Sequence, residues 1–84
     1  MTGYLKNFNM SRFDIILGYM FAHINKYINE LYYASRNNSR YYYELIDNII
    51  ADINKDLEEE LLETLNSKER EDVIQEIEHL LNQF

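Results

Sequence analysis

The chain contains no proline, and its only glycines are Gly3 and Gly18. Proline and glycine are the residues that most strongly interrupt helices and form tight turns, so little in this sequence would stop a long helix. A length of 84 residues corresponds to one small domain. We therefore predict a single all-α domain over residues 1–84, an antiparallel bundle of three helices, or of four if one helix is broken.

The first predicted helix has the densest apolar pattern. Apolar residues from Phe13 to Leu31 recur at alternating steps of four and three, as they do on one face of a helix. Ser11 opens a Ser-x-x-acid pattern that favours a helix start. We predict helix one over 11–34, preceded by a short arm at 1–10. Further apolar residues lie off this face, so we expect neighbours on more than one side, from other helices or from a second copy in a homodimer. These off-face residues are Ile15, Ile16, Tyr19, Phe21 and Ile28.

Two more helices are predicted after a polar turn at 35–39. Helix two is expected over 40–65, capped by Asn38 or Ser39, with Tyr42, Ile46, Ile49 and Ile53 at steps of four, three and four. Its apolar spacing then shifts, so a break near 54–56 is an alternative. A start signal at Asn66 predicts helix three over 67–84.

The residues needed for catalysis are scarce. The chain has no cysteine, its only histidines are His23 and His79, and two isolated glycines cannot form a phosphate-binding loop. Glu76 and His79 lie one helical turn apart, but a carboxylate-bridged metal site in a bundle needs a second such pair, which is missing from the sequence. We therefore expect a protein that binds without catalysis, metal or cofactor.

The sequence also lacks the features of a membrane or secreted protein. Its longest run without charged or strongly polar residues, Ile15 to Ala22, is much shorter than the roughly 20 residues that cross a bilayer. The first residues do not have the pattern of a secretory signal, and the chain has no cysteine for disulfides. We expect a cytoplasmic protein with no membrane association.

Charge is divided unequally along the chain. Up to Tyr43, five Lys and Arg stand against two carboxylates, a net charge of +3. After Tyr43, three stand against thirteen, a net charge of −10. All eight tyrosines lie in the first part, so the two parts are expected to face different surroundings.

The carboxylates of the second part recur at steps of three or four, which places them in strips on helices. On a helix continuing to residue 65 the first strip would be unbroken, and a second would lie on helix three. Such strips are either ordinary solvated faces or surfaces that bind a basic partner. The candidate binding residues are Asp52, Asp56, Glu59, Glu60, Glu63, Glu69, Asp72 and Glu76.

The turn between the first two helices is rich in tyrosine and arginine, the composition of protein-interface hot spots. These side chains could also stack on unpaired bases and contact phosphate, although the overall negative charge makes direct nucleic-acid binding the less favoured interpretation. The candidate residues are Tyr32, Tyr33, Arg36, Arg40, Tyr41 and Tyr43.

The run from Asn9 to Ile15, followed by Gly18 and Tyr19, resembles the opening of short bacteriophage and mobile-element proteins that begin Asn-x-Ser-Arg-aromatic-Asp. The chain departs from those proteins in lacking their Gly- and Trp-containing segment, since it has no Trp. The resemblance implies similarity to phage accessory proteins, a class in which inhibitors of bacterial defence such as anti-CRISPR proteins are common.

Three functions follow from these patterns. The leading hypothesis is a phage-encoded inhibitor whose acidic surface competes with nucleic acid for a basic partner, such as a CRISPR effector or another nucleic-acid-binding protein. The second is a structural or regulatory helical oligomer that associates with copies of itself. The third is a small nucleic-acid binder that uses the Tyr and Arg residues of the turn.

Overall fold

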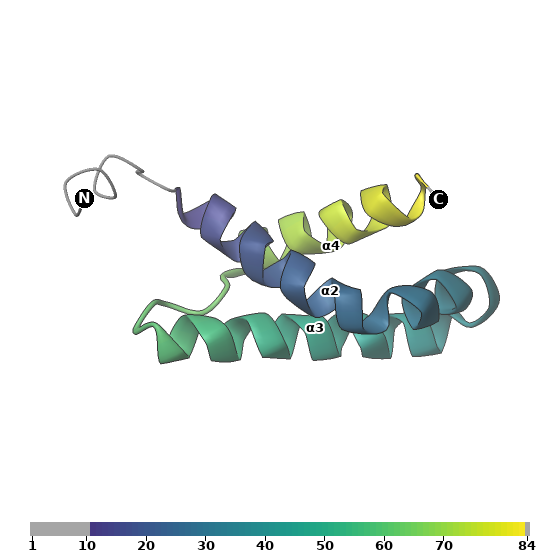
Figure 1. Ribbon diagram of the computed structural model, residues 1–84, viewed down its shortest axis with the longest axis horizontal. Helices are drawn as coiled ribbons and strands as arrows, with labels where there is room; N and C mark the ends of the chain where they lie inside the picture. The colour runs from purple at the N-terminus through teal and green to yellow at the C-terminus, as the bar shows by residue number, and fades with distance from the viewer. Residues whose placement is uncertain (1–10, 84) are drawn as a thin grey trace.

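The computed structural model describes residues 11–83, and within this range the secondary structure consists of three α-helices (Figure 1). With the labels of Figure 1, they are α2 (Arg12–Asn37), α3 (Ser39–Glu59) and α4 (Ser67–Leu81). The predicted all-α bundle is confirmed. The predicted arm at 1–10 lies outside the described residues.

Each helix begins at a polar side chain that accepts a backbone N–H from the residue three positions later. These caps are Ser11 for α2, Asn38 for α3 and Asn66 for α4. At α4, Glu69 also accepts the N–H of Asn66 at 3.1 Å, which completes a capping box. The start signals read from the sequence therefore coincide with the helix starts. The predicted end of helix one at residue 34 and the turn at 35–39 are wrong, because α2 continues to Asn37 and only Asn38 separates it from α3.

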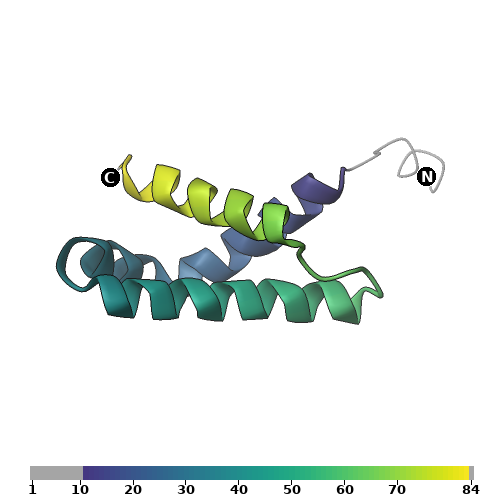
Figure 2. The ribbon, with the colours of Figure 1, turned by 180° about the vertical axis from the view of Figure 1, so that it is seen from behind.

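Helix α2 is the centre of the bundle. It packs against both α3 and α4, whereas contacts between α3 and α4 are sparse. Figures 1 and 2 show α3 and α4 diverging from one another while α2 crosses both. The expectation that this helix has neighbours on more than one side is confirmed. Ile16, which the spacing placed off the packing face, is fully buried because helices lie against two sides of α2.

The core is built from aliphatic residues of all three helices. The four-three-four spacing predicted for α3 is confirmed, because Tyr42, Ile46, Ile49 and Ile53 are all buried. Helix α4 ends at Leu81 rather than at the predicted residue 84, which is outside the described range. The fully or nearly fully buried residues are Ile16, Met20, Ile24, Leu31, Ala34, Tyr42, Leu45, Ile46, Ile49, Ile50, Ile53, Leu57, Val73, Ile77 and Leu81.

Helix α3 ends at Glu59, so the predicted extension to residue 65 is wrong, and the helix runs without a break through 54–56. A Schellman turn closes it: the N–H of Leu62 donates to the carbonyl of Leu57 at 2.8 Å, and the N–H of Leu61 to that of Glu58 at 3.0 Å. Leu61 adopts a positive φ of 61°, in the position where this turn usually has glycine.

Long-range hydrogen bonds hold the segment between α3 and α4. The N–H of Leu65 donates to Oδ1 of Asn54 at 2.8 Å, which folds the segment back against α3. Arg12 of α2 donates to the carbonyls of Glu63 and Thr64 at 2.7 and 3.0 Å. These tertiary contacts replace the intrahelical bonds that a longer α3 would make.

Candidate functional site

Two predicted binding carboxylates connect helices within the bundle. His23 of α2 lies between Asp52 and Asp56 of α3, with its Nε2 2.5 Å from Oδ2 of Asp56 and its Nδ1 3.8 Å from Oδ2 of Asp52. The His23 side chain is only 12% exposed. Asp52 and Asp56 therefore belong to the α2–α3 interface and do not continue an outer acidic strip.

The predicted strip on α4 is also partly occupied by internal contacts. Glu69 caps its own helix and accepts a 2.7 Å bond from Nε of Arg12, and this bond lowers the pKa of the Glu69 carboxyl. Asp72 accepts a 2.8 Å bond from Lys68 one turn earlier. Glu76 is half-buried on α4 and forms no ion pair within residues 11–83. These residues do not form one open acidic face.

The predicted residues Glu59, Glu60 and Glu63 are exposed at and just beyond the end of α3, with Glu58 beside them. None of these four forms an ion pair within the described part of the chain. The last turn of α3 contains no basic residue, although the negative end of a helix dipole favours cations there. These four glutamates therefore form an exposed cluster of negative charge without ion pairs in the described part of the chain.

An apolar hollow of about 430 Å³ lies next to these glutamates. The pKa of the Tyr19 hydroxyl is raised, first by its burial, then by the negative charges of Glu60 and Asp56, by a hydrogen bond to Glu60, and by the charge of Glu59. The acidic end of α3 therefore lies close to Tyr19. The lining residues are Asp14, Ile15, Gly18, Tyr19, Glu60 and Leu62.

Leu61 lies between Glu60 and Leu62, two residues of the lining, and its side chain is 95% exposed. A leucine with so little burial contributes almost nothing to the core. We call Asp14, Ile15, Gly18, Tyr19, Glu58, Glu59, Glu60, Leu61, Leu62 and Glu63 the α3-end surface.

The positive charge predicted at the tyrosine-rich turn is largely satisfied locally. The guanidinium of Arg36 lies 4.2 Å from the centre of the Tyr32 ring, and Nε of Arg40 lies 4.0 Å from Glu44. The Tyr41 hydroxyl donates to Glu30, and this bond is the main cause of the raised pKa of Tyr41.

The exposed tyrosines of the turn are Tyr32, Tyr33 and Tyr43. Tyr42 lies between the predicted residues Tyr41 and Tyr43 in the sequence. It is buried, and this burial raises the pKa of its hydroxyl to about 12. Its ring meets that of Tyr43 edge to face, with 5.3 Å between centroids. A small hollow of about 260 Å³ at this turn is lined by Tyr43 and Arg36 of the predicted residues, together with the buried Tyr42. Tyr32, Tyr33 and Tyr41 are not part of its lining.

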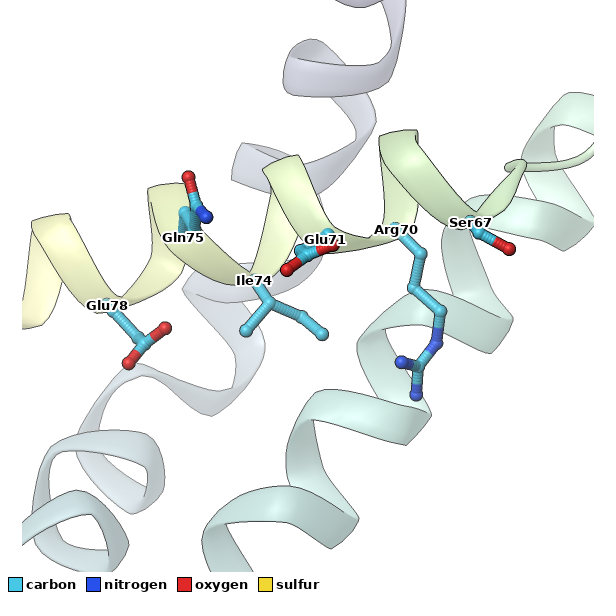
Figure 3. Close-up of a pocket in the computed structure, with 6 residues that line it drawn as sticks. All are labelled: Ser67, Arg70, Glu71, Ile74, Gln75 and Glu78. Atoms are coloured by element: carbon cyan, nitrogen blue, oxygen red, sulfur yellow. The ribbon is translucent and has the colours of Figure 1, made fainter.

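A third hollow, of about 410 Å³, lies along α4 on the side facing α3 (Figure 3). Figure 3 shows Arg70 and Ile74 pointing from α4 toward α3, where Arg70 binds Asp47 at 2.9 Å. Its charged residues have both signs, with Arg70 beside Glu71 and Glu78. It has neither the apolar lining nor the uniform charge of the α3-end surface.

Within residues 11–83, no group of three or more His, Asp or Glu side chains is placed to hold a metal ion. Over the same range, no helix combines the length and apolar character needed to cross a membrane. Comparisons of the chain with protein-family models, with curated proteins and with solved structures found no match.

Sequence reasoning missed the apolar part of the α3-end surface. Gly18 could have been recognised as an unusual choice inside a helix, because glycine there lowers helix stability. Leu61 gave no comparable signal, because Leu-Leu-Glu-Thr-Leu at 61–65 reads as the continuation of an amphipathic helix.

Proposed function

We propose that this protein is a non-catalytic binding protein whose α3-end surface occupies a basic, nucleic-acid-handling surface of another protein and thereby inhibits it. The observation that carries this proposal is the group of exposed glutamates at the end of α3. They are Glu58, Glu59, Glu60 and Glu63. None forms an ion pair among residues 11–83, although Glu63 lies near enough to Arg12 for its negative charge to raise the pKa of that guanidinium.

This charge arrangement is unfavourable for the isolated domain. The glutamates gather at the C-terminal end of α3, where like charges repel one another and the negative end of the helix dipole disfavours carboxylates. Several carboxylates elsewhere in the fold do have cationic partners: Glu69 binds Arg12, and Asp72 binds Lys68. A basic partner would relieve the repulsion at the α3 end and would be attracted to it at long range.

The class of partner is proposed from the same chemistry. Proteins that handle nucleic acid carry surfaces on which Lys and Arg bind phosphates, and a dense carboxylate surface competes for such a site. The resemblance of Asn9 to Ile15 to phage proteins makes a host defence protein, such as a CRISPR effector, the first partner to test.

The test is partner capture from nuclease-treated host lysate by the tagged chain and by a charge-reversal variant. In the variant, Glu59, Glu60 and Glu63 become Lys. A matched control places the same three charge reversals at Glu44, Glu71 and Glu78, which are also exposed but lie elsewhere.

The proposal predicts a stoichiometric nucleic-acid-handling protein that duplex DNA or RNA displaces from the wild-type chain. The variant at residues 59, 60 and 63 should lose this protein while its helical circular dichroism is unchanged. Equal capture by both triple variants and the wild type would refute the proposal.

Self-association is a second candidate function, because some large apolar side chains remain exposed. Phe21 is 45% exposed and Leu61 is almost wholly so. Sedimentation over a range of protein and salt concentrations distinguishes this function: a homodimer or larger oligomer gains mass with concentration, whereas a monomeric inhibitor keeps one sedimentation coefficient.

A further inference from the structure

Three locally unfavourable choices meet at the α3-end surface. Gly18 lies inside a helix, Leu61 has a positive φ, and the last turn of α3 is acidic. Natural sequences tend to agree with their fold at every level, and departures gather where function requires them. Neither Gly18 nor Leu61 is required by a contact within residues 11–83 of the domain.

No packing contact within the described part of the domain requires glycine at position 18. A Cβ added at this position meets no atom within 4 Å, so alanine fits the bundle. Glycine nevertheless weakens the middle of a helix through its backbone freedom. Because Gly18 lines the apolar hollow, its missing side chain allows a ligand to approach the α2 backbone closely.

No contact within the same described residues requires leucine at position 61 either. Its position in the Schellman turn favours glycine, and its side chain is 95% exposed. A leucine held in this conformation projects an aliphatic group into solvent beside the hollow. That is the arrangement expected of a residue that packs against a partner.

We propose that the hollow of the α3-end surface seats an amphipathic segment of a partner protein, with aliphatic side chains flanked by Lys or Arg. The apolar floor of Ile15, Gly18 and Tyr19 accepts the aliphatic groups, and Leu61 packs over them. The unpaired carboxylates of the same surface bind the flanking cations. The charge of the rim selects this occupant over a neutral or acidic segment.

This inference deepens the proposed function and rests on it for the basic character of the partner. The experiment selects binders from a display library of short random peptides on the immobilised full-length chain. The selected peptides are then measured against Gly18→Leu, Leu61→Ala and the control Gln75→Leu, which adds the same side chain at an exposed position on α4. Gly18→Leu improves helix propensity, and the circular dichroism of each variant checks that the helices are retained.

The proposal predicts that selected peptides combine aliphatic residues with Lys or Arg. Their affinity should fall about tenfold or more in Gly18→Leu and in Leu61→Ala, and should stay unchanged in Gln75→Leu. Peptides without basic residues, or a library that yields no binder sensitive to Gly18→Leu, would overturn it.

Other occupants give different results. Concentration-dependent self-association that Gly18→Leu abolishes would assign the hollow to a second copy. Tighter peptide binding by a Leu5→Ser, Phe8→Ser variant would assign it to the chain's own first residues. Either result overturns the proposal. If the peptide test fails while the charge reversal at residues 59, 60 and 63 still abolishes partner capture, the proposed function stands and only this docking mode is lost.

Discussion

The guanidinium of Arg12 donates to both carboxylate oxygens of Glu69, at 2.7 and 3.1 Å, across 57 positions of sequence. The same side chain donates to the carbonyls of Glu63 and Thr64. One residue at the start of α2 thus fixes the start of α4 and the segment that leads into it. The position of the α3-end surface depends on this contact, because its loop residues lie between the two helices.

Replacing Arg12 with Ala should lower the thermal midpoint of unfolding. The substitution leaves Glu69 without its cation and removes two bonds to the connecting segment. Lys68→Ala is the control, because it breaks an exposed pair one turn apart on a single helix, and such pairs contribute little. Equal midpoints for the two variants in a calorimetric scan would contradict the central role of Arg12.

The contribution of Glu69 should disappear in acid. Its pKa is lowered in the folded state by the bond from Arg12, relative to an ordinary value of 4.5. The unfolded state therefore binds the proton more readily, so this contribution is fully present above about pH 4.5 and is lost as the pH falls through the lower folded value.

Glu69→Gln tests the pH dependence, because glutamine can keep the capping box but not the charge. The wild type should be more stable than the variant at pH 7, and the difference should shrink as the pH falls below 4.5. Urea unfolding at several pH values measures it. A difference that stays constant into acid would show that the charge of Glu69 does not contribute.

Leu61→Gly should increase the free energy of unfolding by about 0.5–1 kcal/mol. Glycine removes the strain of a positive φ, which for other residues is about 1–2 kcal/mol, and this gain exceeds the entropy that glycine adds to the unfolded chain. Leu61→Ala retains the strain and should show no such gain. Urea unfolding measures the free energy of unfolding of both variants. If Leu61→Gly were no more stable than Leu61→Ala, the result would argue against the Schellman turn.

Gly18→Ala should stabilise the domain by about 0.5–1 kcal/mol, because the added methyl meets open space and alanine favours the helix. Chemical denaturation provides the value. A loss of stability would mean that Gly18 is required by packing inside the domain.

Ile77→Ala should destabilise the domain by about 2–5 kcal/mol, because Ile77 of α4 is fully buried in the core. Ile74→Ala is the matched control on the same helix, since Ile74 is only partly buried and lines the hollow on the α3 side. If both variants lost the same small amount, α4 would not be packed as described.

Most of the fold could be predicted from local patterns. The caps at Ser11, Asn38 and Asn66 and the four-three spacing of α3 involve neighbours within one or two turns, so the sequence displays them directly. The end of α3 could not be predicted this way. It depends on Leu61 adopting a positive φ and on Arg12 reaching the carbonyls of Glu63 and Thr64, a contact between distant parts of the chain.

The candidate surface was only partly predictable for the same reason. Glu59, Glu60 and Glu63 were recognised by their charge, but Asp52 and Asp56 were assigned to the same strip, although they face His23 across the α2–α3 interface. Only the three-dimensional arrangement separates carboxylates that hold helices together from those left without a partner.

We propose that the residues of the α3-end surface lower the stability of the domain because they serve to bind a partner. The most direct measurement compares the Leu61→Gly variant with the wild type. It determines the free energy of unfolding of each protein and the amount of partner that each captures from host lysate. The account predicts a more stable protein that retains much less partner than the wild type. A more stable protein that captures the partner as well as the wild type would contradict it.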